Sequence, residues 1–127
     1  MTRKEFIKEW IQHFAPHLSR KQMNKLKKWY IWYLFSYEMI PKENFLVGDD
    51  ACKAYDQMDK TNAIASFEEY SRRSKENVEP LEEEYFLAKN IVDFPELYIV
   101  GEDWSWTFIS THENFFDNLG PYFMKLK

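Results

Sequence analysis

Two polar residues at the end of an aromatic stretch, His112 and Glu113, are the pair in this sequence best suited to acid–base chemistry. A histidine beside a carboxylate can serve as a general base for a neighbouring hydroxyl, and Ser110, Thr111 and Tyr122 supply hydroxyls. The structural alternative is that His112 hydrogen-bonds the backbone while Glu113 caps the next turn. Because a lone His-Glu pair has no diagnostic spacing, we prefer the structural alternative and assign no catalytic residue.

The aromatic stretch itself could bind a ligand. From Trp104 to Ile109, large rings alternate with other side chains, as expected for a β-strand with one ring-bearing face. The indoles of Trp104 and Trp106, with the phenol of Tyr122, could stack on a base or a sugar ring. Strand alternation more simply places the ring-bearing face in the core, so we prefer a packing role for it.

Charge is divided unevenly along the chain, which carries a formal net charge of −4. Residues 1–42 contain nine Lys and Arg against three Asp and Glu, whereas the remainder contains eight against eighteen. The two halves could attract each other, or they could present two faces to different partners. The acidic run 82–84 could bind a cation or a basic partner, but a solvated charge run is the simpler interpretation.

Three lysines of the basic half, Lys21, Lys25 and Lys28, are spaced to share one exposed face of a helix. Such a face could bind the phosphates of a nucleic acid. The sequence pI of about 5.4 argues against that function, and a lysine-rich helix face is ordinarily a solvated one. Nucleic-acid binding is therefore the third-ranked hypothesis, and a nucleic acid is not the expected partner.

Several function classes lack their characteristic motifs. The single Cys52 excludes an internal disulfide and a cysteine zinc site, and three scattered histidines form no metal motif. The sequence has no Gly-rich phosphate loop and no nucleophile motif, so neither a metal nor a cofactor is expected. Residues 1–5 do not resemble a signal sequence, and the apolar run 29–35 is shorter than a membrane span, so we expect a cytoplasmic protein.

Two N-terminal helices are marked by capping boxes. The segment 2–5 begins the first helix, whose apolar stripe extends to Phe14. The segment 19–22 begins the second, which we expect to continue to about residue 37. Because residues 29–35 are apolar all round, this second helix is predicted to be the central one, lying across the sheet.

The next elements are shorter. A third helix is expected to be capped within residues 49–50, and a strand is expected over residues 63–70. Strands over 97–100 and 104–109 are predicted to form a hairpin. Its turn would use the access of Gly101 to positive φ.

The C-terminal third contains one ambiguous segment and one clear turn. Residues 80–94 could be helix or strand, and we prefer a strand over 84–89 followed by a helical turn over 90–95. The dipeptide Gly120-Pro121 is a turn signal, which should fold the tail back onto the body of the protein.

Three stretches resemble one family: residues 34–38, the tryptophan-rich strand with its exit at 97–113, and residues 120–123. They are similar to a family of small bacterial proteins, mainly from bacillus-type organisms, that is catalogued as a domain of unknown function. The resemblance covers most of the chain from about Lys8. It implies a single cytoplasmic domain, and it implies no activity, cofactor or partner.

The predicted architecture is an α+β fold in a single domain over residues 1–127. Two N-terminal helices and a short third helix pack on one face of an antiparallel sheet of three or four strands. The first hypothesis for its function is a non-enzymatic binding or interaction protein of regulatory or immunity type, whose partner is another protein. The second is a small hydrolase or transferase that uses His112 and Glu113, and the third is nucleic-acid binding through Lys21 to Lys28.

Overall fold

The computed structural model describes residues 1–26, 31–37, 39–67, 78–91, 96–111 and 120–126, with only the backbone at residues 25 and 26. In chain order the elements are α1 (Arg3–Phe14), α2 (Arg20–Leu26), α3 (Tyr33–Ser36), η1 (Lys42–Asn44), β1 (Leu46–Val47), α4 (Asp49–Asp56), β2 (Ile64–Phe67), β3 (Glu79–Pro80), η2 (Glu83–Tyr85), η3 (Ala88–Asn90), β4 (Leu97–Val100), β5 (Trp106–Ser110) and β6 (Tyr122–Lys125). The strands form one antiparallel sheet in the order β1-β6-β5-β4-β2-β3. This is an α+β fold, as predicted.

Helix α1 begins at the predicted capping box. The backbone N–H of Glu5 donates to the Thr2 hydroxyl at 3.1 Å, and the N–H of Thr2 donates to the Glu5 carboxylate at 3.0 Å. The helix buries Phe6, Trp10 and Phe14 completely or nearly so. Because these residues recur every four positions, they form one apolar stripe against the sheet.

The predicted second helix is interrupted. Its capping box forms, since the backbone N–H of Gln22 donates to the Ser19 hydroxyl at 3.1 Å. However, α2 is described over Arg20–Leu26 and residues 31–32 form a turn before α3, so the expectation of one continuous helix to residue 37 is wrong. Aromatic and β-branched residues are poor helix formers, and a break lets the apolar run enter the core at several points.

The hairpin of β4 and β5 forms as predicted, with Val100 opposite Thr107, but its turn has a different geometry. Positive φ occurs at Trp104 (59°), not at Gly101. Gly101 is needed because any Cβ there would collide with the indole of Trp106. The predicted reason for this glycine was therefore wrong, and close packing against a ring replaces it.

Three strands were not predicted, and they raise the expected three or four strands to six. β6 follows the Gly120-Pro121 turn and lies between β5 and the edge strand β1. The strands β1 and β3 have two residues each, which is too short to show a period of two.

The preferred strand over residues 84–89 is wrong. This segment contains parts of the 3-10 helices η2 and η3 instead. Tyr85 and Ala88 are its buried residues, and their spacing of three matches the period of a 3-10 helix. Of the helical turn predicted over 90–95, residues 92–95 lie outside the described part of the chain.

Helix α4 begins where a third helix was expected, although an aspartate does not cap it. Gly48, with φ 67°, is the N-cap residue of the helix, and because glycine has no side chain it cannot form a side-chain capping bond. The backbone N–H of Gly48 donates to the carbonyl of Pro121 at 2.9 Å, which ties the start of α4 to β6. The glycine is thus placed by a backbone contact with the sheet.

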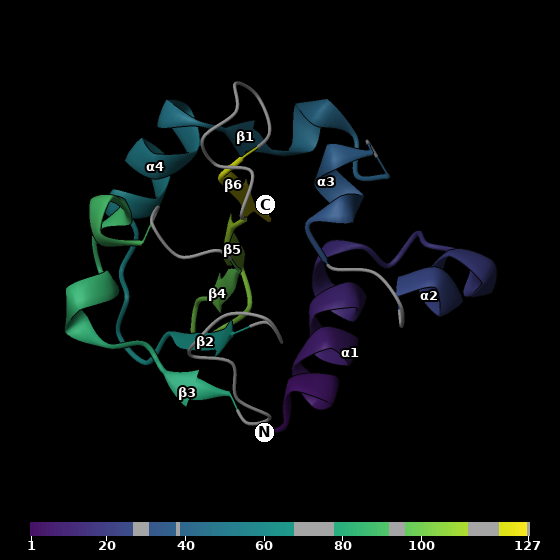
Figure 1. Ribbon diagram of the computed structural model, residues 1–127, viewed down its shortest axis with the longest axis horizontal. Coiled ribbons are helices and arrows are strands. Elements are labelled where there is room, and N and C mark those ends of the chain that lie inside the picture. Colours follow the sequence, from purple (N-terminus) through teal and green to yellow (C-terminus); the bar gives the residue numbers. More distant parts are fainter. Residues whose placement is uncertain (27–30, 38, 68–77, 92–95, 112–119, 127) are drawn as a thin grey trace.

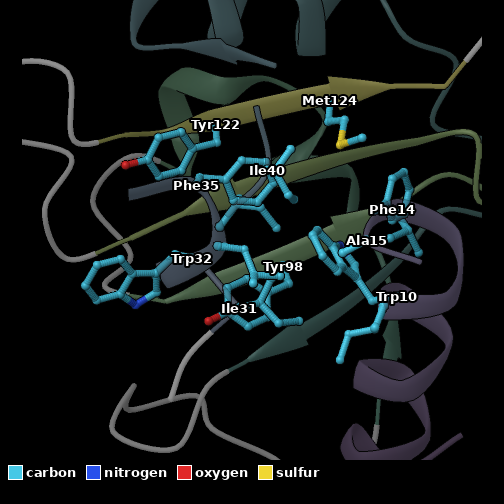
Figure 2. Packing of buried hydrophobic residues seen from close by; sticks show 14 of the residues in the cluster. Trp10, Phe14, Ala15, Ile31, Trp32, Phe35, Ile40, Tyr98, Tyr122 and Met124 are labelled. Atoms are coloured by element: carbon cyan, nitrogen blue, oxygen red, sulfur yellow. The ribbon is translucent and has the colours of Figure 1, made fainter. Parts of the chain in front are cut away.

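Both faces of the sheet are covered, which corrects the prediction of helices on one face. In Figure 1 the sheet is seen edge-on, with α1, α2 and α3 on one side and α4 with the 3-10 helices η2 and η3 on the other. The α1–α3 side packs on Tyr98, Ile109 and Tyr122, as Figure 2 shows for the two tyrosines. The α4 side packs on Phe108 and its neighbours on the opposite face. Within the described residues, no helix has the length and apolar character needed to cross a membrane.

Candidate functional site

The predicted acid–base pair, His112 and Glu113, lies outside the described residues, but the strand ends that lead to it are described. Strand β5 ends at Ser110, and Ser110 and Thr111 are both buried. The register places Leu97 opposite Ser110, and extending it by one residue brings Glu96 opposite Thr111. The two residues that precede His112 in the chain are therefore buried polar residues at one end of the sheet.

Five polar side chains gather at this end of the sheet on the α1–α3 face. We call this the strand-end cluster; it consists of Ser66, Glu96, Tyr98, Thr111 and Tyr122. None of the five is more than 1 % exposed. Ser66 pairs across the strands with Tyr98, so their side chains lie on one face.

The phenol oxygens of Tyr98 and Tyr122 point away from Phe14, toward the same side as the indole nitrogen of Trp32 (Figure 2). A buried carboxylate and buried hydroxyls are costly unless they are hydrogen-bonded, so a cluster of them indicates a specific arrangement. Chemically, a carboxylate with several hydroxyls can orient a neighbouring group or hold a proton. Sequence reasoning missed Ser66 and Glu96, because only the strand register brings Ser66 opposite Tyr98 and Glu96 next to Thr111.

The three aromatic candidates for ligand stacking do not share a face. Trp106 is 3 % exposed and packs between Tyr55 and Phe123, at centroid distances of 5.7 and 6.2 Å. Tyr122 lies on the opposite face of the sheet, stacked on a phenylalanine of α3 at 5.0 Å. Trp104 packs with the cluster of Tyr122, so the predicted common face of Trp104 and Trp106 is wrong.

The left-handed backbone at Trp104 explains this error, because it ends the strand alternation before Trp106. The Trp104 ring is half-buried between two residues of α1: it stacks on His13 at 5.3 Å and contacts Phe6 at 5.4 Å. The Nε2 atom of His13 lies 3.4 Å from the Glu9 carboxylate. Trp104 therefore attaches the hairpin turn to α1.

The basic helix face is described only in part. Lys21 is exposed at the start of α2, beside the exposed Arg20. The backbone of Lys25 belongs to α2, whereas its side chain and all of Lys28 lie outside the described residues. Exposed lysines also occur on α1, at positions 4 and 8.

Exposed acidic residues gather on the other side of the sheet. We call α4, the turn after it, η2 and η3 the acidic layer. Its exposed carboxylates are Asp49, Asp50, Asp56, Asp59, Glu82, Glu83 and Glu84. Among the described residues of this layer, the exposed basic residues are Lys53 and Lys89. The uneven charge along the sequence thus becomes a division between the two layers of helices.

Two further titratable groups of the acidic layer, Cys52 and Lys60, are partly or fully buried, and their surroundings indicate structural roles. Burial raises the pKa of the Cys52 thiol, and the nearby carboxylates of Asp56 and Asp49 raise it further, so this thiol is a passive one. Lys60 is 7 % exposed, and its ammonium donates to the carbonyl of Tyr55 in the last turn of α4. Burial lowers the pKa of Lys60, and the role of this lysine is to cap the helix.

A metal site is not formed by the described residues, because they include no group of three or more His, Cys, Asp or Glu side chains placed to hold an ion. The described part of the chain likewise gives no arrangement that points to a cofactor. This leaves the strand-end cluster and the charged layers as the candidate functional features.

Comparison with known proteins gives one match. Residues 3–123 match the model of a family described as a domain of unknown function, DUF4275. No curated protein and no solved structure matches the chain significantly. The match confirms the expectation of a family catalogued as a domain of unknown function. Since it spans almost the whole sequence, the chain belongs to the DUF4275 family.

Proposed function

We propose that this protein is a non-enzymatic binding module of regulatory or immunity type, and that its acidic layer contacts a basic surface of a protein partner. The observation that carries the proposal is the division of exposed charge between the two layers of helices. We further propose that it works in the cytoplasm of a bacterial cell, since a lone thiol suits a reducing compartment.

The sheet keeps the two charged layers apart. Stacked layers in proteins lie about 10 Å apart, so the centres of the two helical layers are separated by roughly 20 Å and their outer surfaces by more. The Debye length at physiological ionic strength is about 8 Å, so the opposite charges do not neutralise each other across the sheet. The acidic layer can therefore attract a basic partner as strongly as its own charge allows.

The acidic layer is also held rigidly, which favours binding because little conformational freedom is lost. The Tyr55 hydroxyl donates to the carbonyl of Tyr85 at 2.6 Å, joining α4 to η2. The backbone N–H of Ala88 donates to the Asp56 carboxylate at 2.8 Å, joining α4 to η3. These bonds fix the position of the acidic run 82–84 relative to the carboxylates of α4.

The test compares two triple charge reversals in a pull-down from bacterial lysate. Glu82→Lys/Glu83→Lys/Glu84→Lys changes the acidic layer, and Lys4→Glu/Lys8→Glu/Lys21→Glu is the matched control on the other side of the sheet. We expect the wild type and the control to capture the same basic protein in 50 mM NaCl, and the acidic-layer variant to lose it. Thermal melting establishes that each variant is folded. Capture that is unaffected by the acidic-layer change contradicts the proposal.

A second candidate function is a small hydrolase or transferase that uses His112 and Glu113. The observation that favours it is the strand-end cluster, which supplies Glu96 and Thr111 next to the start of this segment. Such groups could position a histidine acting as general base.

The enzyme hypothesis is tested with His112→Ala and a panel of chromogenic ester and phosphoester substrates. If the hypothesis is right, the wild type turns over one of them and the variant is folded but inactive. Inactivity of the wild type on the whole panel contradicts the hypothesis, and a His112→Ala variant that only unfolds the protein shows that the residue is structural.

A further inference from the structure

We infer that the side of the molecule opposite the acidic layer binds single-stranded nucleic acid, using the rings of α3 and the basic start of α2. This inference does not depend on the proposed function, because it concerns the other layer and a different class of ligand. It starts from three stacked rings, which we call the α3 ladder: Trp32, Tyr33 and Tyr37.

The α3 ladder leads from the core to the solvent. Trp32 is 3 % exposed and stacks on Tyr33 at 4.3 Å, with 27° between the ring planes. Tyr33 in turn stacks on Tyr37 at 5.3 Å and 29°. Tyr37 is 65 % exposed, the highest value among the large hydrophobic side chains described. The ladder thus presents an anchored ring to solvent, and a nucleobase can stack on such a ring.

Basic groups belong to the same side of the molecule. The Nε2 atom of His17 lies 2.8 Å from the carbonyl oxygen of Met39, which joins the chain just before α2 to the chain just after Tyr37. Arg20 and Lys21 are exposed at the start of α2. Positive charges that can hold phosphates and a ring on which a base can stack are the combination that single-strand binding proteins use.

The overall pI no longer opposes this function. The sequence pI of about 5.4 reflects an excess of carboxylates, but seven exposed ones lie in the acidic layer, across the sheet. At physiological salt, charges that are separated by more than a Debye length are largely screened from each other. A local positive surface is therefore compatible with a net charge of −4.

The ligand class follows from the geometry of stacking. A base inside a duplex is covered on both faces by its neighbours, so it cannot stack on a side chain unless it is unstacked first. An exposed tyrosine ring therefore selects single strands. Stacking of one base on one side chain strengthens binding by roughly 5- to 150-fold.

The experiment measures fluorescence anisotropy of a labelled 15-nucleotide oligo(dT) in 50 mM NaCl. We expect Tyr37→Leu, which removes the ring, to weaken binding about tenfold. Tyr37→Phe keeps the ring and should bind within about twofold of the wild type. Lys21→Glu should weaken binding and reduce its salt dependence, whereas Lys89→Glu, the matched charge change in the acidic layer, should leave the affinity within about twofold.

Three outcomes overturn the inference. The first is absence of binding by the wild type in 50 mM NaCl. The second is equal affinity of Tyr37→Leu and the wild type, which would mean a polyanion surface without stacking. The third is equal or tighter binding of a 15-base-pair duplex. Because Tyr37 is exposed, its variants should keep the wild-type melting temperature, so a loss of binding reports on the surface and not on the fold.

Discussion

The two faces of the sheet differ in how they treat polar groups. On the α4 face, the polar atoms are used to fasten α4 to the 3-10 helices, as in the bond from the Tyr55 hydroxyl to Tyr85. On the α1–α3 face, the indole N–H of Trp10 donates to the Thr107 hydroxyl, which donates to a strand carbonyl, and the strand-end cluster lies further along the same face. On the α4 face the described polar contacts join separate elements, whereas the α1–α3 face buries a group of polar side chains at one end of the sheet.

The outer surfaces of the two layers differ as well. The acidic layer carries carboxylates on a rigid frame, and the opposite layer combines lysines with exposed rings. The same sheet therefore supports two surfaces that are suited to partners of opposite charge.

The largest expected effect comes from emptying the core on either face. Trp10 and Phe108 are both fully buried, Trp10 on the α1–α3 face and Phe108 on the α4 face. Each change to alanine should lower the free energy of unfolding by about 3–5 kcal/mol, measured by urea denaturation. If only one of the two substitutions were costly, the layers would not form one cooperative unit.

The hairpin turn gives the next effect. Gly101→Ala places a methyl group against the indole of Trp106 and should lower the free energy of unfolding by about 1–3 kcal/mol. A second change, Trp106→Phe, makes room for it, so the double variant should be more stable than the sum of the two single losses predicts. Strict additivity would show that the indole is not the obstacle.

A smaller effect is expected from the bond that joins α4 to η2. Tyr55→Phe removes the hydroxyl and leaves the buried carbonyl of Tyr85 without its donor, which should cost about 1–2 kcal/mol in denaturation experiments. The matched change Tyr37→Phe, at an exposed ring, should cost about 0.5 kcal/mol or less. A similar cost at both sites would mean that the Tyr55 bond does not stabilise the acidic layer.

The smallest effects concern the helix starts. Thr2→Ala and Ser19→Ala each remove a capping hydroxyl and should cost about 1 kcal/mol. Hydrogen bonds from Thr2 also lower the pKa of Glu5 below its ordinary value of 4.5, so this carboxylate stabilises the fold above that pH. The contribution is lost as the pH falls through the lowered pKa of the folded state.

Denaturation at a series of pH values below 4.5 checks that linkage. The wild type should lose stability somewhat more steeply than Thr2→Ala over this range, because the variant loses the hydroxyl that lowers the pKa of Glu5 but keeps the backbone N–H that donates to the same carboxylate. Parallel curves would show that the Thr2 hydroxyl does not contribute to the lowered pKa of Glu5.

The elements that the sequence predicted well depend on local contacts. A capping box involves residues three positions apart, and a hairpin pairs neighbouring strands, so the residue types alone specify both. The break between α2 and α3 and the two-residue strands depend on the rest of the fold. Alternation showed which side chains share a face of β5, but it could not show that two layers would cover the sheet.

The candidate site was less predictable than the fold. His112 and Thr111 were singled out by residue type, whereas Ser66 and Glu96 join the strand-end cluster only through the strand register. Two rings of the α3 ladder, Trp32 and Tyr33, belong to the apolar run 29–35 that was interpreted as core, whereas the exposed Tyr37 follows the last residue of α3. The division of charge was visible in the sequence, but its placement on opposite sides of the sheet required the fold.

The most direct test of the divided surface is retention on ion-exchange resins at pH 7 in low salt. A net charge of −4 with mixed surface charge would bind the anion exchanger alone. We predict that the wild type is retained by both the anion and the cation exchanger, and that Lys4→Glu/Lys8→Glu/Lys21→Glu is retained by the anion exchanger only. A wild-type protein that flows through the cation exchanger would contradict the account.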